Sequence, residues 1–458
     1  AGDESPDDLA PTRPATPSPD TGGVFRLPRL YLPRPGIELR KWAVVACDQY
    51  TAEPEYWRQL EDEVGAAPST LHLIFPEAYL GADDAAQRIA RIQATMRRYL
   101  HEGLLVPHDG AVLVERRTVH GTRRGLMLEL DLEHYDFSPA STSLIRPTEG
   151  TIVERLAPRI EVRRGAELEL PHILVLIDDA QRTVIEPIAA AREHLAPLYD
   201  TELMAGGGHL RGYAIAAAQA AALQRTLRAL IEPQAFAARC AVPPGTAPML
   251  FAVGDGNHSL ATAKAIWQQS REVLGPDHPS RHALVEVVNI HDEALAFEPI
   301  HRLLFGVQGD LRAALAERFG SKLRLREASD AQNMRTMVQA AAAPQQAFGI
   351  VGPGAHFTVA QIADAPSPLP VGTLQGFVDA FIAAGGAAQV DYVHGDDVLE
   401  RLGQQAGQTG LHLATVPKSE LLRRVLLHGP LPRKAFSMGE AHDKRFYFEA
   451  RRIRDAAA

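Results

Sequence analysis

Short apolar runs alternate along this chain with stretches whose hydrophobic residues recur at helical spacing. Runs of roughly four to eight apolar residues predict buried strands, since both faces of such a strand must be apolar. The clearest runs lie within Trp42–Ala46, Leu170–Asp179, Met249–Val253 and His282–Ile290. The segment Asp84–Glu102 instead spaces its apolar residues three and four apart, which predicts an amphipathic helix. This alternation predicts an α/β or mixed α+β fold whose core sheet is partly parallel.

Changes in composition predict a tail, a main domain and an inserted subdomain. Residues 1–23 are rich in Pro, Asp, Ser and Thr, so we expect a disordered tail; it lacks the basic start and apolar core of a signal peptide. Residues 24–305 are expected to form the main α/β domain. Residues 306–370 carry few chemical signals and are expected to form a small inserted αβ subdomain. Residues 371–458 return to strand–helix alternation and are expected to complete the main domain.

Composition and charge narrow the function classes. The 458 residues are 46% hydrophobic and 22% charged, as in an ordinary globular protein. A net charge of −9 argues against a general nucleic-acid binder, so no nucleic-acid partner is expected. No apolar run is long enough for a membrane helix. The two cysteines, Cys47 and Cys240, are too few for a disulfide framework, and a cytoplasmic location is expected.

The stretch Met249–Trp267 is the strongest candidate for chemistry. An apolar strand is broken by Gly254-Asp255-Gly256, and a helix is expected to follow with Ser259 as its N-cap. Free N–H groups at a helix N-terminus favour an anion such as phosphate. His258 and Asp255 are placed to move protons or hold a metal there. The alternative is an ordinary turn, since Asp and Asn are common turn residues and neither nucleotide-binding glycine motif is present.

The sequence DGNHSLATAKA in this stretch resembles the signature of the domain-of-unknown-function family 1015. Many members carry D-G-H-H-R here, whereas this chain has Asn257 and Ser259 at two of those positions. Other segments resemble a branch of the same family, namely Lys41–Trp57, Arg146–Asp179, Leu284–Phe305 and Leu431–Ile453. The resemblance runs over most of residues 24–453 but carries no established activity.

A remoter similarity is to the ParB/sulfiredoxin superfamily, whose small-molecule kinases phosphorylate free serine. Their D-G-H-x-R loop binds nucleotide phosphates, and Asp255, Gly256 and His258 align loosely with it. The resemblance implies a nucleotide as cofactor. The missing Arg at Ser259 removes a phosphate clamp from that pattern.

Carboxylates also follow other apolar strands. Asp48 comes directly after the strand Trp42–Ala46, where open α/β sheets place ligands, although it can equally cap the next turn. Asp178 and Asp179 end the strand of Leu170–Asp179. Adjacent carboxylates can hold Mg²⁺, or they can cap the following helix.

Two charged segments complete the candidate set. The stretch Arg146–Arg164 is rich in arginine and is interrupted by prolines, which does not suit a plain helix. Within it Glu149 could act as a general base while the arginines clamp an anionic substrate. A surface ion-pair network is the alternative. Near the C-terminus, Arg433 and Lys434 could neutralise a phosphate or be solvated surface charges.

Together these patterns predict an enzyme whose polar strand ends converge on one cleft that takes a small anionic or phosphorylated metabolite. The first hypothesis is phosphotransfer from a nucleotide to a small hydroxylated metabolite, with Mg²⁺ and the nucleotide as cofactors. Metal-assisted hydrolysis and a non-catalytic nucleotide-binding regulator are the alternatives. The candidate catalytic residues are Asp48, Glu149, Asp255 and His258; the candidate phosphate- or substrate-binding residues are Arg146, Thr148, Gly256, Asn257, Ser259, Lys264, Arg433 and Lys434; and the candidate metal ligands are Asp178 and Asp179. The oligomeric state stays open.

Overall fold

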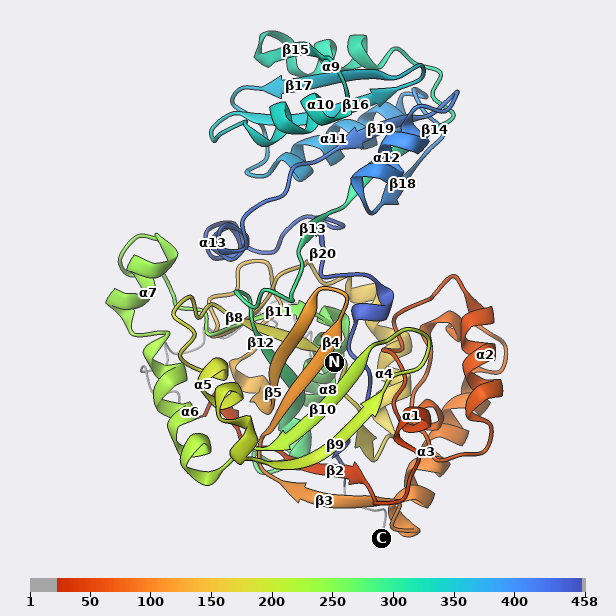
Figure 1. Ribbon diagram of the computed structural model, residues 1–458, viewed down its shortest axis with the longest axis vertical. Coiled ribbons are helices and arrows are strands. Elements are labelled where there is room, and N and C mark those ends of the chain that lie inside the picture. Colours follow the sequence, from red (N-terminus) through yellow and green to blue (C-terminus); the bar gives the residue numbers. More distant parts are fainter. Residues whose placement is uncertain (1–22, 455–458) are drawn as a thin grey trace, which may run out of the picture.

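Two sheets organise the chain in the computed structural model, which describes residues 23–454 (Figure 1). The tail expected over residues 1–23 therefore lies almost wholly outside the described residues. The larger, nine-stranded sheet belongs to the lobe at the bottom of Figure 1, and the smaller, six-stranded sheet belongs to the lobe at the top. None of the helices between residues 23 and 454 is long and apolar enough to cross a bilayer.

The nine-stranded sheet is mixed, as predicted. Its strands run in the spatial order β6 (Ile145–Pro147), β11 (Phe251–Asp255), β8 (Leu174–Ile177), β12 (His282–Asn289), β5 (Gly121–Asp131), β4 (Val112–Thr118), β10 (His209–Ala214) and β9 (Ala196–Glu202), with β1 (Phe25–Arg26) on β5. The pairs β6–β11 and β8–β12 are parallel, whereas β8 and β11 run antiparallel. Strand direction in this part of the sheet decides which polar strand ends meet.

Alternate side chains of the central strands enter cores on opposite faces of this sheet. On β5, Leu126 and Leu128 join one core and Met127 joins the other, because successive strand side chains point to opposite faces. Helices pack on each face and bury it (Figure 1). The helices of this lobe are α1 (Leu39–Trp42), α2 (Pro54–Val64), α3 (Ala85–His101), α4 (Leu156–Arg164), α5 (Ile185–Ala190), α6 (Ala217–Ala229), α7 (Pro233–Cys240) and α8 (Asn257–Leu274).

The smaller lobe is an antiparallel sheet with helices on both faces. Its strands follow the order β15 (Leu323–Ala328), β17 (His356–Ile362), β16 (Gln346–Gly352), β19 (Thr409–His412), β14 (His301–Phe305) and β18 (Gln389–Val393). Its helices are α9 (Leu311–Phe319), α10 (Ala331–Gln339), α11 (Pro370–Ala383) and α12 (Asp396–Gly403).

The predicted subdomain boundaries at 306 and 370 differ from this lobe. Strands β14, β18 and β19 lie outside that range and yet pair within the six-stranded sheet. Strand–helix alternation after residue 371 predicted the elements but carries no information about which sheet they join, since pairing partners are set by tertiary contacts. The chain returns to the larger lobe with α13 (Lys418–His428), whose Leu422 and Val425 pack against β8, β11 and β12. Further on, Tyr447 and Phe448 enter the core of that lobe.

Three short ribbons tie distant parts of the chain together. The segments that leave and re-enter the larger lobe pair as β13 (Glu298–Pro299) and β20 (Phe436–Ser437), between the lobes in Figure 1. The others are β2 (Arg29–Pro33) with β3 (Leu105–Asp109), and β7 (Leu168–Glu169) with β21 (Arg451–Arg452). The β13–β20 ribbon places residues 431–440 beside the end of β11.

Candidate active-site cleft

The loop from β11 to α8 is the centre of the site. Gly256 is the N-cap of α8 and has a φ of +81°, a conformation that glycine adopts without strain. A Cβ at this position would lie 2.9 Å from Cγ1 of Ile173, so close packing also requires glycine. The helix begins at Asn257, and the prediction of Ser259 as N-cap is wrong because the left-handed turn at Gly256 starts the helix earlier. The amides of residues 257–259 precede the first intrahelical bond, from Leu260 N to Gly256 O.

Strand direction brings Thr148 and Glu149 to the same place. Because β6 is parallel to β11, the residues after both strands lie at one edge of the sheet. The Thr148 hydroxyl donates to the carbonyl of Val253 at 2.7 Å, which fixes this loop against β11. Glu149 in turn forms an isolated parallel β-bridge with Leu431. The segment that carries Arg433 and Lys434 is therefore held at this edge.

A third group reaches the cleft from the N-terminal part of the chain and from β8. Val45 forms an isolated antiparallel β-bridge with Phe446, and Asp48 follows three residues later in the chain. His172 precedes β8, and the antiparallel pairing of β8 with β11 puts the start of β8 beside the end of β11. Nε2 of His172 lies 3.7 Å from Oδ2 of Asp48, and its Nδ1 lies 2.9 Å from the hydroxyl of Tyr447.

These residues line two adjoining cavities of about 410 Å³ and 610 Å³. Both cavities are lined by Asp48, Glu149, Asp255 and Lys434. The smaller cavity adds Asn257, His258 and Ser259 from the start of α8, three arginines (Arg155, Arg159 and Arg163) and the buried pair His172 and Tyr447. The larger cavity adds Thr148, His394, Ser437 and Lys444 and an apolar wall that includes Phe297, Leu422 and Met438. Acidic groups and a cation therefore stand where the two cavities meet.

His258 is held as a neutral ring. Burial, followed by the charges of Arg159 and Arg155, lowers the pKa of His258 to about 4. The backbone N–H of Ile152 donates to its Nε2 at 3.3 Å, so the ring proton is at Nδ1. His258 is therefore equipped as a hydrogen-bond donor at neutral pH, and the nitrogen that a base would use already accepts a bond.

The carboxylates of the cleft differ in their surroundings. Burial raises the pKa of Glu149, and the charges of Lys434 and Arg433 oppose that shift. Asp255 accepts a bond from the N–H of Gly256 at 3.1 Å and lies 3.3 Å from Nζ of Lys444. Burial also raises the pKa of Glu77, which lines the smaller cavity but is paired with Arg159. A raised pKa brings a carboxylate closer to neutral pH, which suits it to accept a proton.

Only the second half of the arginine-rich segment Arg146–Arg164 forms a helix, α4, and only one of the two prolines lies in it, since Arg146 and Pro147 belong to β6. Pro158 lies in the first turn of this helix, where its missing N–H removes no intrahelical bond. Nε of Arg159 donates to Glu77 at 2.8 Å, and Arg163 lies 2.7 Å from Glu169. These arginines line the cleft and also belong to the ion-pair network that was the alternative interpretation.

Two predicted phosphate-binding residues lie away from the cleft. Arg146 is buried and donates to the carbonyls of Ser143, Ala247 and Pro248, so it fastens neighbouring loops. Lys264 is buried on α8, and its Nζ donates to the carbonyl of Leu132 at 2.7 Å. The sequence spacing placed Lys264 on the helix after the loop but did not show that it faces the core side.

Asp178 and Asp179 lie at the opposite end of the sheet from Asp255. They follow β8, which runs antiparallel to β11, so their strand ends point away from the cleft. Asp179 accepts bonds from the N–H groups of Thr183 and Val184, in the turn that leads into α5. Asp178 lies 2.6 Å from Nε2 of His291, which follows the parallel strand β12. Asp178 and Asp179 therefore do not share a metal site with His172 and His258, which line the cleft.

Several lining residues were not among the predicted sites. Glu77, Tyr447 and Lys444 come from segments far apart in the chain. Tyr447 and Lys444 lie in the family-like segment Leu431–Ile453, which is the one signal that pointed to them. Glu77 follows an apolar stretch with no motif, so only the fold reveals it. No three of these carboxylates and histidines form a metal-ligand group; the single such group within residues 23–454 is in the smaller lobe.

Comparison with known proteins gives a family and remote structural likenesses. A family model described as "Protein of unknown function (DUF1015)" matches residues 31–381. No curated protein matches the chain.

The solved structures that resemble the chain do so weakly. A mutant free serine kinase in complex with AMP is 11% identical with a TM-score of 0.38, covering 70% of this chain and 90% of its own. A conserved hypothetical protein from Pyrococcus furiosus is 12% identical with a TM-score of 0.33, covering 68% of this chain and 89% of its own. SbnI with C-terminal truncation from Staphylococcus aureus is 10% identical with a TM-score of 0.32, covering 68% and 83%. At these scores the likeness carries no functional argument.

Proposed function

Because the chain belongs to the DUF1015 family, which brings no activity with it, we propose from the cleft itself that the protein transfers a phosphoryl group from a nucleotide to a small hydroxylated metabolite. One observation carries the proposal: two cavities meet at Asp48, Glu149, Asp255 and Lys434. A transfer between two substrates needs both of them bound with acid–base and positively charged groups between them.

The start of α8 supports phosphate binding. Its first amides point at the smaller cavity with the partial positive charge of the helix N-terminus. Asn257, next to Gly256, is 5% exposed, and its Oδ1 has no hydrogen-bond partner. A buried acceptor of this kind is costly unless a ligand donates to it, so it favours a substrate with a hydroxyl or ammonium group.

The cations of the cleft suit the charge of the transferred group. Lys434 lines both cavities. Arg433 lies close enough for its charge to lower the pKa of Glu149 and that of His258. Phosphoryl transfer depends mainly on positioning and charge neutralisation, so no further nucleophile is required. In the transfer, the acceptor oxygen forms a bond to phosphorus while the bond between phosphorus and the nucleotide oxygen breaks. Glu149 accepts the hydroxyl proton.

The two cavities suit different substrates. The larger one has an apolar wall from Phe297, Leu422 and Met438, which fits the flat, largely apolar face of a nucleobase. The smaller one is lined by arginines and carboxylates, which fit a small polar metabolite.

Magnesium is the expected metal for this reaction. Asp48, Glu149 and Asp255 supply the oxygen donors that Mg²⁺ prefers, and two of them with phosphate oxygens are enough to hold it. When bound, Mg²⁺ would neutralise charge on the phosphates.

The test is direct. Purified protein is incubated with ATP, ADP or CTP, Mg²⁺ and serine-like acceptors, and products are followed by phosphorus NMR and mass spectrometry. We expect a phosphorylated acceptor and a nucleotide that is shorter by one phosphate, with thermal stabilisation by the nucleotide alone. The proposal would be contradicted if no nucleotide gave either turnover or thermal stabilisation.

A further inference from the structure

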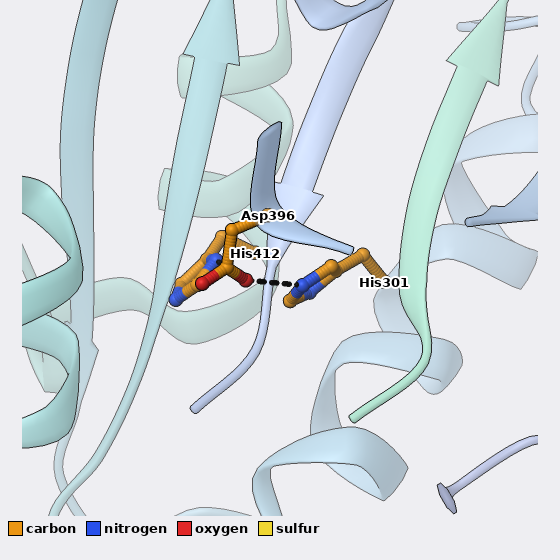
Figure 2. Close-up of side chains that lie close together, drawn as sticks. All are labelled: His301, Asp396 and His412. Carbon is orange, nitrogen blue, oxygen red and sulfur yellow. Dashed lines mark hydrogen bonds and ion pairs between the residues drawn. The ribbon is translucent and has the colours of Figure 1, made fainter. Parts of the chain in front are cut away.

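A second cluster of titratable side chains lies outside the cleft, in the smaller lobe. Figure 2 shows the carboxylate of Asp396 beside the imidazole rings of His301 and His412. The two rings are stacked, with centroids 4.7 Å apart and planes 24° apart. Both histidines are buried, with 1% and 4% of their surface exposed.

Sheet register brings the three residues together. Strands β14 and β19 are antiparallel with Arg302 opposite Leu411, so His301 at the start of one strand lies near His412 at the end of the other. Strand β18 pairs with the other side of β14, and the chain then turns at Gly395, whose φ is +93°, into α12. Asp396 is the first residue of that helix.

The donor atoms have the spacing of metal ligands. One ligand atom from each residue lies within 4.8 Å of the others, and among the described residues no other group of three His, Cys, Asp or Glu does so. Oδ1 of Asp396 is 2.8 Å from Nε2 of His301 and 3.6 Å from Nδ1 of His412. Neighbouring ligands of a tetrahedral zinc ion with bonds of 2.0–2.1 Å are about 3.3 Å apart. The observed separations lie on either side of that value.

Two further observations point to a ligand at this cluster. Nδ1 of His412 is buried and has no hydrogen-bond partner, which is costly for a polar atom. The cluster also opens on a cavity of about 690 Å³ that is lined by Arg335, Thr336 and Gln339. An ion held here would therefore keep coordination positions open to exchangeable water or an anion.

We propose that His301, Asp396 and His412 bind a divalent transition-metal ion. Two imidazoles and one carboxylate suit zinc, and they also suit other late first-row metals. Arg335 faces the same cavity, and its guanidinium lies 2.5 Å from Oε1 of Glu400. This ion pair compensates the charge of Arg335 and so reduces its repulsion of a bound cation.

Binding requires one exchange at His301. The N–H of Leu413 donates to Nδ1 of this ring at 3.0 Å, so the proton of the neutral ring is at Nε2 and points to Asp396. A metal at Nε2 replaces that proton, which moves to Nδ1, and Leu413 gives up its bond. We therefore expect weaker binding than at a preformed structural zinc site.

The test uses the full chain, with Zn²⁺ titrated by calorimetry and Co²⁺ followed by its visible absorption. We expect one ion at this site, with affinity lowered at least about tenfold, or the site lost, in Asp396→Asn and His412→Gln. Asp397→Asn, which changes the exposed neighbour in the same helical turn, and His356→Gln, on the exposed side of β17, should bind as the wild type does.

Circular dichroism separates loss of binding from loss of folding. Folded Asp396→Asn and His412→Gln variants that bind Zn²⁺ with wild-type affinity would overturn the proposal. If both variants fail to fold, the wild type still decides: a folded chain with no visible Co²⁺ bands and no heat on Zn²⁺ addition has no such site. Neither result depends on any phosphotransfer activity.

Discussion

The backbone N–H of Ile152 donates to Nε2 of His258 at 3.3 Å and so determines which nitrogen of this ring carries the proton. With the pKa of His258 lowered to about 4, the ring is neutral and its N–H is at Nδ1. A histidine beside a glycine turn invites the interpretation of a catalytic base. The bond from Ile152 instead leaves Nδ1 as the donor of this ring, and we expect that donor to orient a ligand.

His258→Gln should therefore reduce turnover only modestly. Loss of one hydrogen bond to a ligand costs about 0.5–1.5 kcal/mol, which is roughly two- to tenfold in rate or affinity. Loss of a general base would cost roughly 10²–10⁴-fold. Steady-state kinetics of the variant between pH 5 and 8 distinguish the two, and a loss in the larger range would show that His258 transfers a proton.

Glu149→Gln should remove most of the activity, roughly 10²–10⁴-fold, because the amide cannot accept the hydroxyl proton. In the wild type, activity should fall as pH falls through the raised pKa of Glu149, since a base must be deprotonated to act. Glu154→Gln changes an exposed carboxylate in the same segment and serves as the control. Equal activity of the two variants would exclude Glu149 as the base.

Lys434→Met should weaken nucleotide binding by roughly ten- to a hundredfold, as expected for the loss of a charged hydrogen-bond partner. The salt dependence of binding should also become shallower, because one cation no longer contacts the phosphates. Isothermal calorimetry at two salt concentrations measures both effects. Lys322→Met, at an exposed ion pair with Asp364 in the smaller lobe, should leave affinity and salt dependence as in the wild type.

Gly256→Ala should lower the free energy of unfolding by about 1–3 kcal/mol. At a φ of +81° a residue with a Cβ is strained, and the added Cβ would lie 2.9 Å from Cγ1 of Ile173. Gly275→Ala carries backbone strain alone, since its φ is +82°, its ψ is +164° and its Cβ would meet no neighbour, and it should cost about 1–3 kcal/mol. Urea denaturation measures both losses, and unchanged stability of Gly256→Ala would contradict the prediction.

Acid should destabilise the fold below about pH 6.5. Burial lowers the pKa of His282 and His412 from the ordinary value, the latter to about 4. These two histidines therefore bind more protons in the unfolded chain than in the folded one in this range, and each lowers the free energy of unfolding by at most about 1.4 kcal/mol per pH unit as pH falls. Urea melts at pH 7, 6 and 5 should show this loss.

His282→Gln removes one of these titrating groups. Its unfolding free energy should therefore change less steeply with pH than that of the wild type. The matched His356→Gln variant, at an exposed position of β17, should keep the wild-type slope. A wild-type slope in His282→Gln would show that this ring does not stay neutral when folded.

Local sequence was sufficient for the elements and for the centre of the cleft. Apolar runs predicted β8, β11 and β12, and the glycines of Gly254–Gly256 predicted the turn into α8, because burial and backbone freedom depend on residues close together in the chain. The prediction that Asp48, Glu149, Asp255, His258 and Lys434 gather at this turn agrees with the lining of the cavities. Their catalytic roles stay predictions.

The direction of the strands determines which of the remaining candidate residues lie at the cleft, and only the tertiary structure shows that direction. Asp178 and Asp255 both lie at the ends of apolar strands. The neighbouring sequence does not predict that these strands, β8 and β11, run in opposite directions. Lys264 likewise lies on the side of α8 that faces the core, so it does not reach the cleft. Strand pairing in the second sheet places His301 next to His412. Such contacts join residues that are far apart in the chain, so their geometry follows from how whole elements pack and not from the pattern within any one of them.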